Sequence, residues 1–318
     1  MCIIRHRLSK LTRVGTPGGS LNPVVEVWLI VARELRKNMR SVKGLVMLGL
    51  SILGAVASVL RQPRFEEVLK NAEGMGSEAF HDAKVQVLAG MYRDEKVGER
   101  LADAPARLVI FFFVAIWLTP LLVGVVGFDG ISSDLQYRTV RYWTIRTRRA
   151  SYYVGKFLGL WGGVAAMTFA MHLIVWTVMI VRADASASQT VNWGIRFWLT
   201  SLPVTGAWCA VATLVGSLFK TPIMGLLITS AVFFVMFFVG FVIPNAYASV
   251  DQMSAPKPSV VDQASNVVVA LRFLYPNSLD AWLLSPEPLR VLEGLGVFLA
   301  YAAATCFGGS LIFARRDV

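Results

Sequence analysis

The sequence predicts an all-α membrane protein. Of its 318 residues, 55% are hydrophobic and only 16% are charged, and the mean hydropathy is +0.58. Soluble domains carry about 25% charged residues. Several uncharged stretches approach or exceed the roughly 20 residues that an α-helix needs to cross the hydrocarbon core. We therefore expect six transmembrane helices, preceded by an amphipathic interfacial helix and interrupted by a small helical extracytoplasmic insertion.

The N-terminal region divides into two parts. Residues 1–22 carry four arginines and lysines, then glycines and a proline, and lack the apolar core of a signal peptide. They predict a flexible basic cytoplasmic leader. Residues 23–43 predict a helix in the headgroup plane, with apolar residues on one face. The charged residues expected on its opposite, solvated face are Glu26, Arg33, Lys37 and Arg40. A basic soluble helix packed on a partner is the alternative.

Six uncharged stretches define the transmembrane domain predicted for residues 44–318. They are 44–60, 108–127, 158–181, 197–219, 223–244 and 291–313. Two long connections are expected outside the cytoplasm. Residues 61–107 predict a small helical subdomain, and residues 245–290 predict a short or re-entrant helix pair.

The distribution of basic residues predicts the orientation. Segments 1–43, 129–156, 220–222 and 314–318 together hold 18 of the 31 lysines and arginines but only 5 of the 20 acidic residues. Cytoplasmic loops carry this excess of positive charge. We expect a multi-pass protein of the cell membrane with both termini in the cytoplasm. The net charge of +11 lies between spans rather than on a nucleic-acid-binding motif, so no nucleic acid is expected.

The connection 129–156 is amphipathic. Its apolar side chains can bury against membrane or partner, and its arginines are expected to stay solvated. Such a stiff segment can pass a partner's motion to the spans on either side. An ordinary basic loop that only fixes the topology explains the composition equally well.

The same connection resembles the cytoplasmic loop of ABC-2 type permeases. The matching residues are Phe128, Asp129, Ile131, Ser132, Arg138, Thr139, Val140, Gly155, Lys156, Phe157 and Gly159. Asp134 replaces the usual Glu, Tyr137-Arg138 replaces an Arg-Gly pair, and the small-Pro turn is missing at 146–148. The helix containing residues 32–36, the large first outer segment, the six spans and the closing residues 314–317 are also similar to that family.

The resemblance implies the permease subunit of an ATP-driven exporter. A second permease subunit, identical or similar, would complete the pathway in the lipid membrane. A separate ABC-type ATP-binding subunit would bind ATP and Mg²⁺ and dock on the connection, so no cofactor is expected in this chain. The residues that the resemblance assigns to ATPase coupling are Arg33, Glu34, Asp129, Ser133, Asp134, Arg138, Thr139, Arg141 and Trp143. The usual cargo would be lipids, polysaccharides, drugs, peptides or ions.

Two other functions fit parts of the sequence. A non-transporting relative would pass ATP-driven motion to an outer partner at residues 61–107. A membrane-embedded transferase would need paired carboxylates, but Asp129 and Asp134 are five residues apart, beyond the spacing that pairs side chains on a helix.

Motifs for catalysis are missing from the sequence. It contains no G-x-x-x-x-G-K-[ST], HExxH or GxSxG pattern, so the chain is expected not to be an enzyme. Three isolated histidines and three scattered cysteines predict no metal site. His172, within a predicted span, and Tyr275 and Asp280, in the second outer segment, are candidate pathway residues, although a hydrogen-bonded neutral imidazole is the simpler interpretation of His172.

Overall fold

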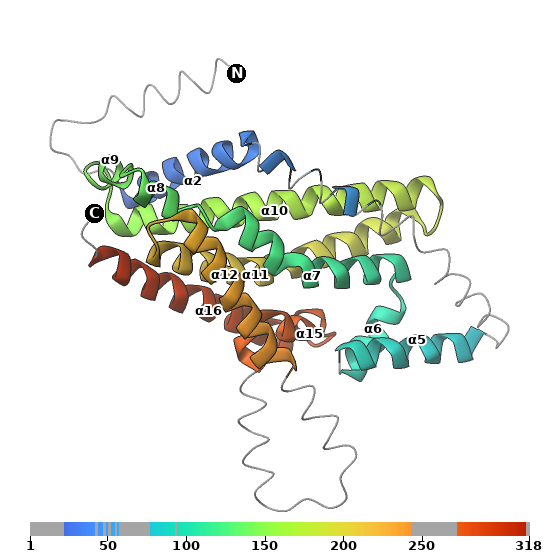
Figure 1. Cartoon of the computed structure of the whole chain (residues 1–318). Helices are drawn as coiled ribbons and strands as arrows, with labels where there is room; N and C mark the ends of the chain where they lie inside the picture. Colours follow the sequence, from blue (N-terminus) through green and yellow to red (C-terminus); the bar gives the residue numbers. More distant parts are fainter. Residues whose placement is uncertain are drawn as a thin grey trace, which may run out of the picture.

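The computed structural model describes residues 22–41, 44–46, 49, 52–54, 56, 77–92, 94–242 and 272–315, and every regular element in these ranges is helical (Figure 1). The predicted leader up to residue 21, most of the first predicted span 44–60, and residues 61–76 and 243–271 lie outside the described residues. The helices are α2 (Pro23–Arg40), α5 (Ser77–Tyr92), α6 (Glu95–Ala102), α7 (Ala106–Gly127), α8 (Ser132–Gln136), α9 (Val140–Thr144), α10 (Arg149–Val181), α11 (Ala187–Leu218), α12 (Pro222–Phe237), the π-helical η1 (Phe238–Val242), the 3-10 helices η2 (Arg272–Leu274) and η3 (Pro276–Leu279), α15 (Asp280–Leu284) and α16 (Pro288–Ala314).

Five helical segments of the described chain are long and apolar enough to span a membrane. They are Ala106–Gln136, Arg149–Val181, Ala187–Leu218, Pro222–Val242 and Pro288–Ala314. They overlap the last five stretches predicted from hydropathy. The chain is therefore a multi-pass α-helical membrane protein.

Two of these helices begin earlier than the sequence predicts. α10 starts at Arg149 rather than at 158, and α11 starts at Ala187 rather than at 197. At 33 residues, α10 is about 50 Å long, whereas the hydrocarbon core is about 30 Å thick. Hydropathy marks only the part of a helix that lies in lipid. Residues 149–156, predicted to belong to a loop, are therefore the first two turns of α10.

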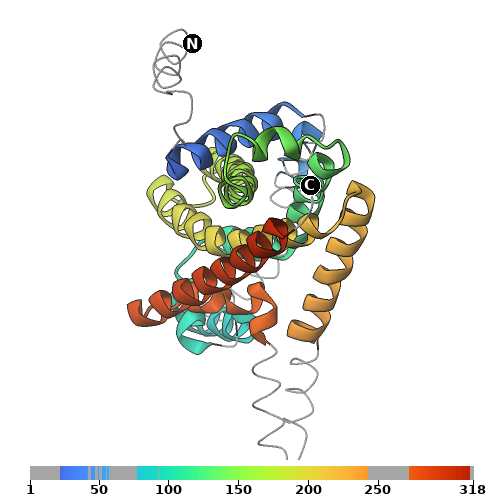
Figure 2. The same ribbon diagram turned by 90° about the vertical axis from the view of Figure 1, so that its left-hand side faces the viewer.

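α11 lies at the centre of the helix bundle. In its most apolar window 72% of the residues are buried, compared with 22% for α12 and its π-helical extension and 17% for α16. α12 stands apart from the other helices in the end-on view (Figure 2). The exposed apolar side chains of α12 and α16 are thus available to lipid or to another subunit.

α2 lies across the first half of α10, and the two helices make close contact along a line of glycines (Figures 1 and 2). A Cβ atom added to Gly155 would lie 2.7 Å from Cβ of Ile30, and one added to Gly159 would lie 2.6 Å from Cβ of Glu34. These spacings are too short for real Cβ contacts. The missing side chains therefore let the α2 backbone approach α10.

The opposite end of the bundle carries α5 and α6, which are tied to the segment before α16. Arg290 lies 2.9 Å from Oδ2 of Asp94, and Lys96 lies 2.5 Å from Oε1 of Glu287. Arg100 donates to the carbonyl of Leu284 at 3.2 Å. The helices α5 and α6 are thereby fixed against the segment around the start of α16.

A helix-terminating turn at the end of α10 positions another ion pair. Ala183 adopts a positive φ of 52°, and the amides of Ala183 and Asp184 donate to the carbonyls of Ile180 and Met179. This is the Schellman pattern, which usually has glycine at the left-handed position. The turn brings the Asp184 carboxylate to the guanidinium of Arg107 at the start of α7.

A proline inside α7 is accommodated by a distant side chain. Pro120 has no N–H to donate, so the carbonyl of Ile116, four residues earlier, loses its helical partner. Nδ2 of Asn277 donates to that carbonyl at 2.8 Å, while Oδ1 of Asn277 accepts from Nε1 of Trp208 at 2.7 Å. The segment before α15 is thus inserted between α7 and α11.

Candidate functional site: a basic platform on a buried ion cluster

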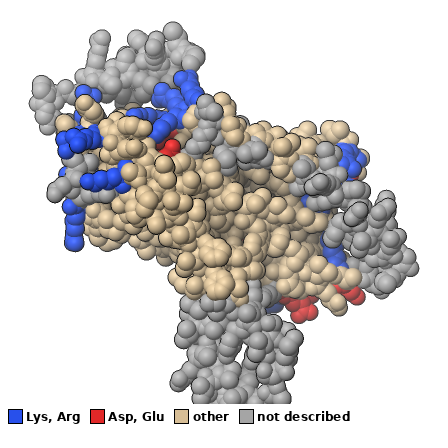
Figure 3. All heavy atoms as spheres, in the orientation of Figure 1, with Lys and Arg blue, Asp and Glu red and all other residues tan. Residues whose placement is uncertain are grey.

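The segments α2, α8, α9 and the first turns of α10 gather at one end of the bundle, and we call this group the platform (Figure 1). Figure 3 shows that Lys and Arg side chains gather over this end, whereas uncharged atoms cover most of the middle of the same face. The exposed arginines of the platform include Arg138, Arg141 and Arg146. The predicted solvation of these side chains agrees with the structure.

The connection between α7 and α10 folds as two short helices. Ser132 and Ser133 donate their hydroxyls to the carbonyls of Phe128 and Asp129, which closes the turn before α8. Between α8 and α9, Arg138 adopts a φ of 55°, in the left-handed region that favours glycine. This is the position at which the resembling family has glycine, so the Arg138 backbone keeps a turn that the side chain disfavours.

The outer surface of α9 exposes large side chains. Tyr142 is 75% exposed and Ile145 is 81% exposed, whereas Leu135 and Val140 are buried as the amphipathic pattern predicts. Ile145 follows the last turn of α9, and its exposed side chain is available to a membrane or a partner, as the sequence predicts. The guanidinium of Arg33 lies over the Trp143 ring at 4.3 Å, which joins α2 to α9.

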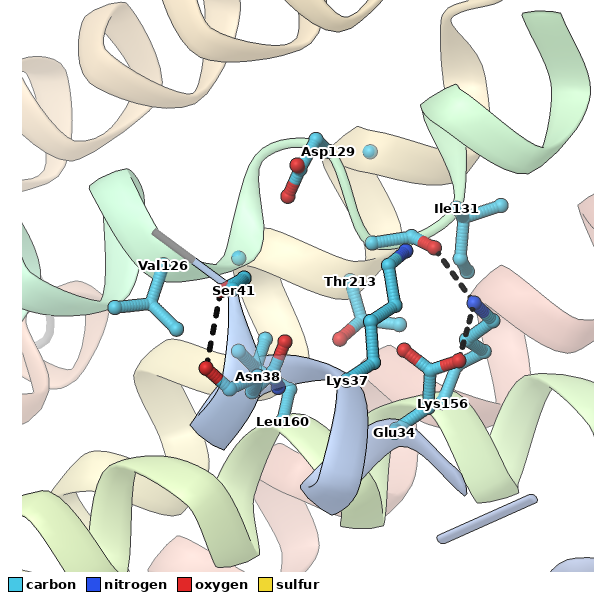
Figure 4. A pocket seen from close by; sticks show the side chains of 13 residues that line it. Glu34, Lys37, Asn38, Ser41, Val126, Asp129, Ile131, Lys156, Leu160 and Thr213 are labelled. Carbon is cyan, nitrogen blue, oxygen red and sulfur yellow. Dashed lines mark hydrogen bonds and ion pairs between the residues drawn. The ribbon is translucent and has the colours of Figure 1, made fainter. Parts of the chain in front are cut away.

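Lys156 is the centre of the platform's buried interior. Its Nζ lies 2.8 Å from Oε1 of Glu34 and 2.5 Å from Oδ2 of Asp134, and it donates to the carbonyl of Gly130 at 2.9 Å. One ammonium group thus binds α2, α8 and the turn after α7 to α10 (Figure 4). All three charged side chains are at least 90% buried.

Asp134 uses its remaining acceptor positions within the same cluster. The hydroxyl of Tyr152 donates to Oδ2 of Asp134 at 2.6 Å, and the hydroxyl of Thr139 donates to Oδ1 at 3.0 Å. A buried charge is tolerated when it is paired and fully hydrogen-bonded. Asp134 and Glu34 are therefore internal residues of the platform and not part of its exposed surface.

Glu26 corrects the predicted orientation of α2. It was expected on the solvated face, yet it is only 2% exposed, and its Oε2 accepts from the backbone amide of Arg148 at 3.2 Å. That carboxylate lies at the start of α10, where amides lack helical partners and negative charge is favourable. The buried face of α2 consists of Glu26, Ile30, Val31 and Glu34. Trp28, which the pattern places on the apolar face, is 66% exposed.

A small cavity of about 80 Å³ adjoins the ion cluster. Figure 4 shows Asp129, Lys37 and Thr213 around it, with Glu34 and Lys156 on one side. The cavity separates the end of α2 from the end of α7.

The three candidate pathway residues do not come together. His172 is buried, its Nδ1 bonds the Thr168 carbonyl of its own helix at 2.8 Å, and its ring packs on Phe111. Tyr275 and Asp280 instead line a common cavity at the end of the bundle opposite the platform. Within the described ranges, no group of three or more His, Cys, Asp or Glu side chains could hold a metal ion.

Sequence reasoning missed several residues of the cluster. Lys156, Tyr152 and Glu26 were not assigned a role, although Lys156 is a lone lysine at the start of a long apolar stretch. Such a lysine needs a carboxylate partner if its helix is enclosed, and that was the available signal. Tyr152 and Glu26 gave no signal, because their partners are distant in the sequence.

The fold and the platform define a polytopic membrane subunit that has no nucleotide-binding motif of its own and has a basic surface between two spans. Comparison with protein families agrees. The ABC-2 family transporter protein model matches residues 28–318, which is most of the chain, and the chain belongs to this family. It is a membrane subunit of an ABC transporter, a class that generally associates with an ATP-binding subunit. A comparison with curated proteins gives no match.

Proposed function

We propose that the chain is one half of an ATP-driven exporter of the cell membrane, with the platform and both termini in the cytoplasm. Two copies, or one copy and a similar subunit, would form the pathway. The concentration of arginines at the platform end supports this orientation, because cytoplasmic loops are enriched in Lys and Arg. The exposed apolar side chains of α2, among them Val24 and Trp28, fit the acyl chains next to the headgroups.

The platform is proposed to be the docking surface of the ATP-binding subunit. Tyr142 and Ile145 expose large apolar side chains beside solvated arginines, and such patches mark sites of protein interaction. Tyrosine and arginine are also enriched among residues that contribute most to binding. Residues assigned to ATPase coupling then have two roles. Arg138 and Arg141 are exposed and can contact the ATP-binding subunit, whereas Glu34, Asp134 and Thr139 hold the surface in place.

The single observation that carries the proposal is the position of Lys156 below this surface. Through Glu34, Asp134 and Gly130 it links α2, α8 and the end of α7 to the long helix α10. A displacement of α8 and α9 by a moving ATPase therefore cannot be absorbed by a soft loop. We infer that it shifts α10 and α7 together and thereby changes access to the pathway.

The experiment compares substitutions of exposed residues at the two ends of the bundle. The double variant Tyr142→Ala/Ile145→Ser should lose co-purification of the ATP-binding subunit and stimulation of its ATPase, while circular dichroism of the chain stays unchanged. Arg182→Ala, at the opposite end, is the matched control. Full ATPase stimulation in the double variant would contradict docking at the platform.

The orientation has its own test. Cysteine introduced at Ile145 should react with an impermeant maleimide in inside-out vesicles and not in right-side-out vesicles. Reaction only from the outside would place the platform away from the ATP pool and overturn the proposal.

A further inference from the structure

A second cavity of about 200 Å³ lies at the end of the bundle away from the platform. It is enclosed by the end of α5, by α7 and η1, and by the segment that runs from η3 into α15. Aromatic rings and polar groups both contribute to its wall. The rings of Phe113, Trp117, Phe241, Tyr275 and Trp282 line it. Trp117 meets Phe241 edge-on at 4.6 Å between ring centroids, so the wall is closely packed.

One carboxylate in this aromatic wall has no cationic partner. In the part of the chain that the structure describes, no lysine or arginine pairs with Asp280, whose buried carboxyl accepts from the backbone amides of Asp280 and Ala281. The other carboxylate at the cavity, Asp94, is already satisfied, because it accepts from the amide of Val97 at 3.2 Å and pairs with Arg290 at 2.9 Å. Among the described residues that line the cavity, Asp280 is thus the carboxylate without a cation.

A buried hydroxyl at the same cavity also lacks a partner. Tyr92 is only 7% exposed, and its Oη makes no hydrogen bond with any described residue. Tyr92 and Asp280 both line this cavity, and burial together with the Asp280 carboxylate raises the pKa of Tyr92. Buried polar groups are normally hydrogen-bonded. A Tyr92 hydroxyl without a described partner, beside an Asp280 carboxylate without a described cation, therefore indicates a ligand that donates hydrogen bonds.

We propose that this cavity binds an organic ammonium ion. Its N–H groups would donate to the Asp280 carboxylate and to Oη of Tyr92, and its carbon substituents would pack on the rings of Trp117 and Tyr275. Aromatic faces attract ammonium groups, and one carboxylate matches a single positive charge. A divalent metal is the poorer fit, because Ca²⁺ takes about six to eight oxygen ligands. The cavity volume is smaller than the roughly 300–1,000 Å³ of pockets that bind drug-sized ligands. It therefore fits a small ammonium-bearing group.

The test uses the full chain, purified without its ATP-binding subunit, and isothermal titration calorimetry. The probe is benzylammonium, and ethylbenzene is its uncharged isostere. Benzylammonium should bind and ethylbenzene should bind at least about tenfold more weakly, because only the former carries the charge. Asp280→Asn should weaken benzylammonium binding about tenfold or more. Asp103→Asn, the same charge change at an exposed site outside the cavity lining, should leave it unchanged.

A second probe separates the hydroxyl from the carboxylate. Tyr92→Phe should weaken benzylammonium about three- to tenfold but leave benzyltrimethylammonium unaffected, since that ion has no N–H to donate. Equal binding of benzylammonium and ethylbenzene, or an unchanged affinity in Asp280→Asn, would show a merely apolar void and overturn the inference. The measurement needs neither ATP nor a partner subunit, so its result is independent of the proposed coupling at the platform.

Discussion

The ammonium nitrogen of Lys156 lies 2.8 Å from Oε1 of Glu34, and this contact joins the oblique helix α2 to the spanning helix α10. The two residues are 122 positions apart in the chain. The same nitrogen reaches Asp134 at 2.5 Å, so one lysine pairs with carboxylates from two other helices. This one side chain therefore helps to fix the position of the platform relative to α10.

Replacing Lys156 by Met is expected to destabilise the chain by about 3–5 kcal/mol, because it leaves two buried carboxylates without their cation. Denaturant unfolding of the detergent-solubilised protein measures the free energy. Lys220→Met removes an equal charge from an exposed position and should change it by less than about 0.5 kcal/mol. Similar losses in both variants would show that the ion cluster contributes nothing specific.

Gly159 and Gly163 provide a matched pair on α10. A methyl group on Gly159 would meet Cβ of Glu34 at 2.6 Å, whereas one on Gly163 would make ordinary contact with Nδ2 of Asn38 at 3.5 Å. Gly159→Ala should therefore cost about 1–3 kcal/mol through overpacking. Gly163→Ala should be neutral or stabilising by up to about 1 kcal/mol, because alanine favours the helix. Thermal unfolding distinguishes them, and a stabilising Gly159→Ala would refute the close approach of α2.

Asn277 and Pro120 should be energetically coupled. Asn277→Leu leaves the Ile116 carbonyl and the Trp208 indole N–H unpartnered, at about 1–3 kcal/mol each. Pro120→Ala restores a backbone N–H to Ile116. In the Pro120→Ala background, Asn277→Leu should consequently cost less by about 1 kcal/mol or more. A double-mutant cycle on unfolding free energies measures this coupling, and strict additivity would contradict it.

Binding of an ammonium ion at the cavity lined by Asp280 and Tyr92 should depend on pH. Burial raises the pKa of Asp280 to about 7, so its carboxyl is largely neutral at pH 6 and ionised at pH 8. The other titratable groups at the cavity are Tyr92, Tyr275 and Asp94, and Asp94 is held by Arg290. The affinity for benzyltrimethylammonium, whose charge is fixed, should therefore rise about tenfold from pH 6 to pH 8.

The control for this pH dependence is Asp280→Asn. This variant should bind weakly and equally at both pH values, because its side chain does not titrate. A pH dependence that persists in Asp280→Asn would assign the titration to another group.

Much of the architecture follows from the sequence. The apolar stretches that begin at 108, 158, 197, 223 and 291 all overlap observed helices, because every backbone N–H and C=O in lipid must be satisfied within the helix itself. The helices α10 and α11 begin nine and ten residues before the predicted membrane spans. Outside lipid, helix formation depends on capping and packing, and hydropathy does not report either. The first stretch, 44–60, stays a prediction.

The sequence by itself determined which segments can reside in lipid and, through the residues around Asp129 to Gly159, to which family the chain belongs. These are local properties, because hydrophobic length and motif spacing are readable along a single segment. The tertiary structure alone decided that Glu26, Glu34 and Asp134 are buried, that Asn277 substitutes for the N–H missing at Pro120, and that Asp280 and Tyr92 share a cavity. The reason is physical. The cost of burying a charge or polar group depends on its partner, and these partners lie on other helices, far away in the sequence.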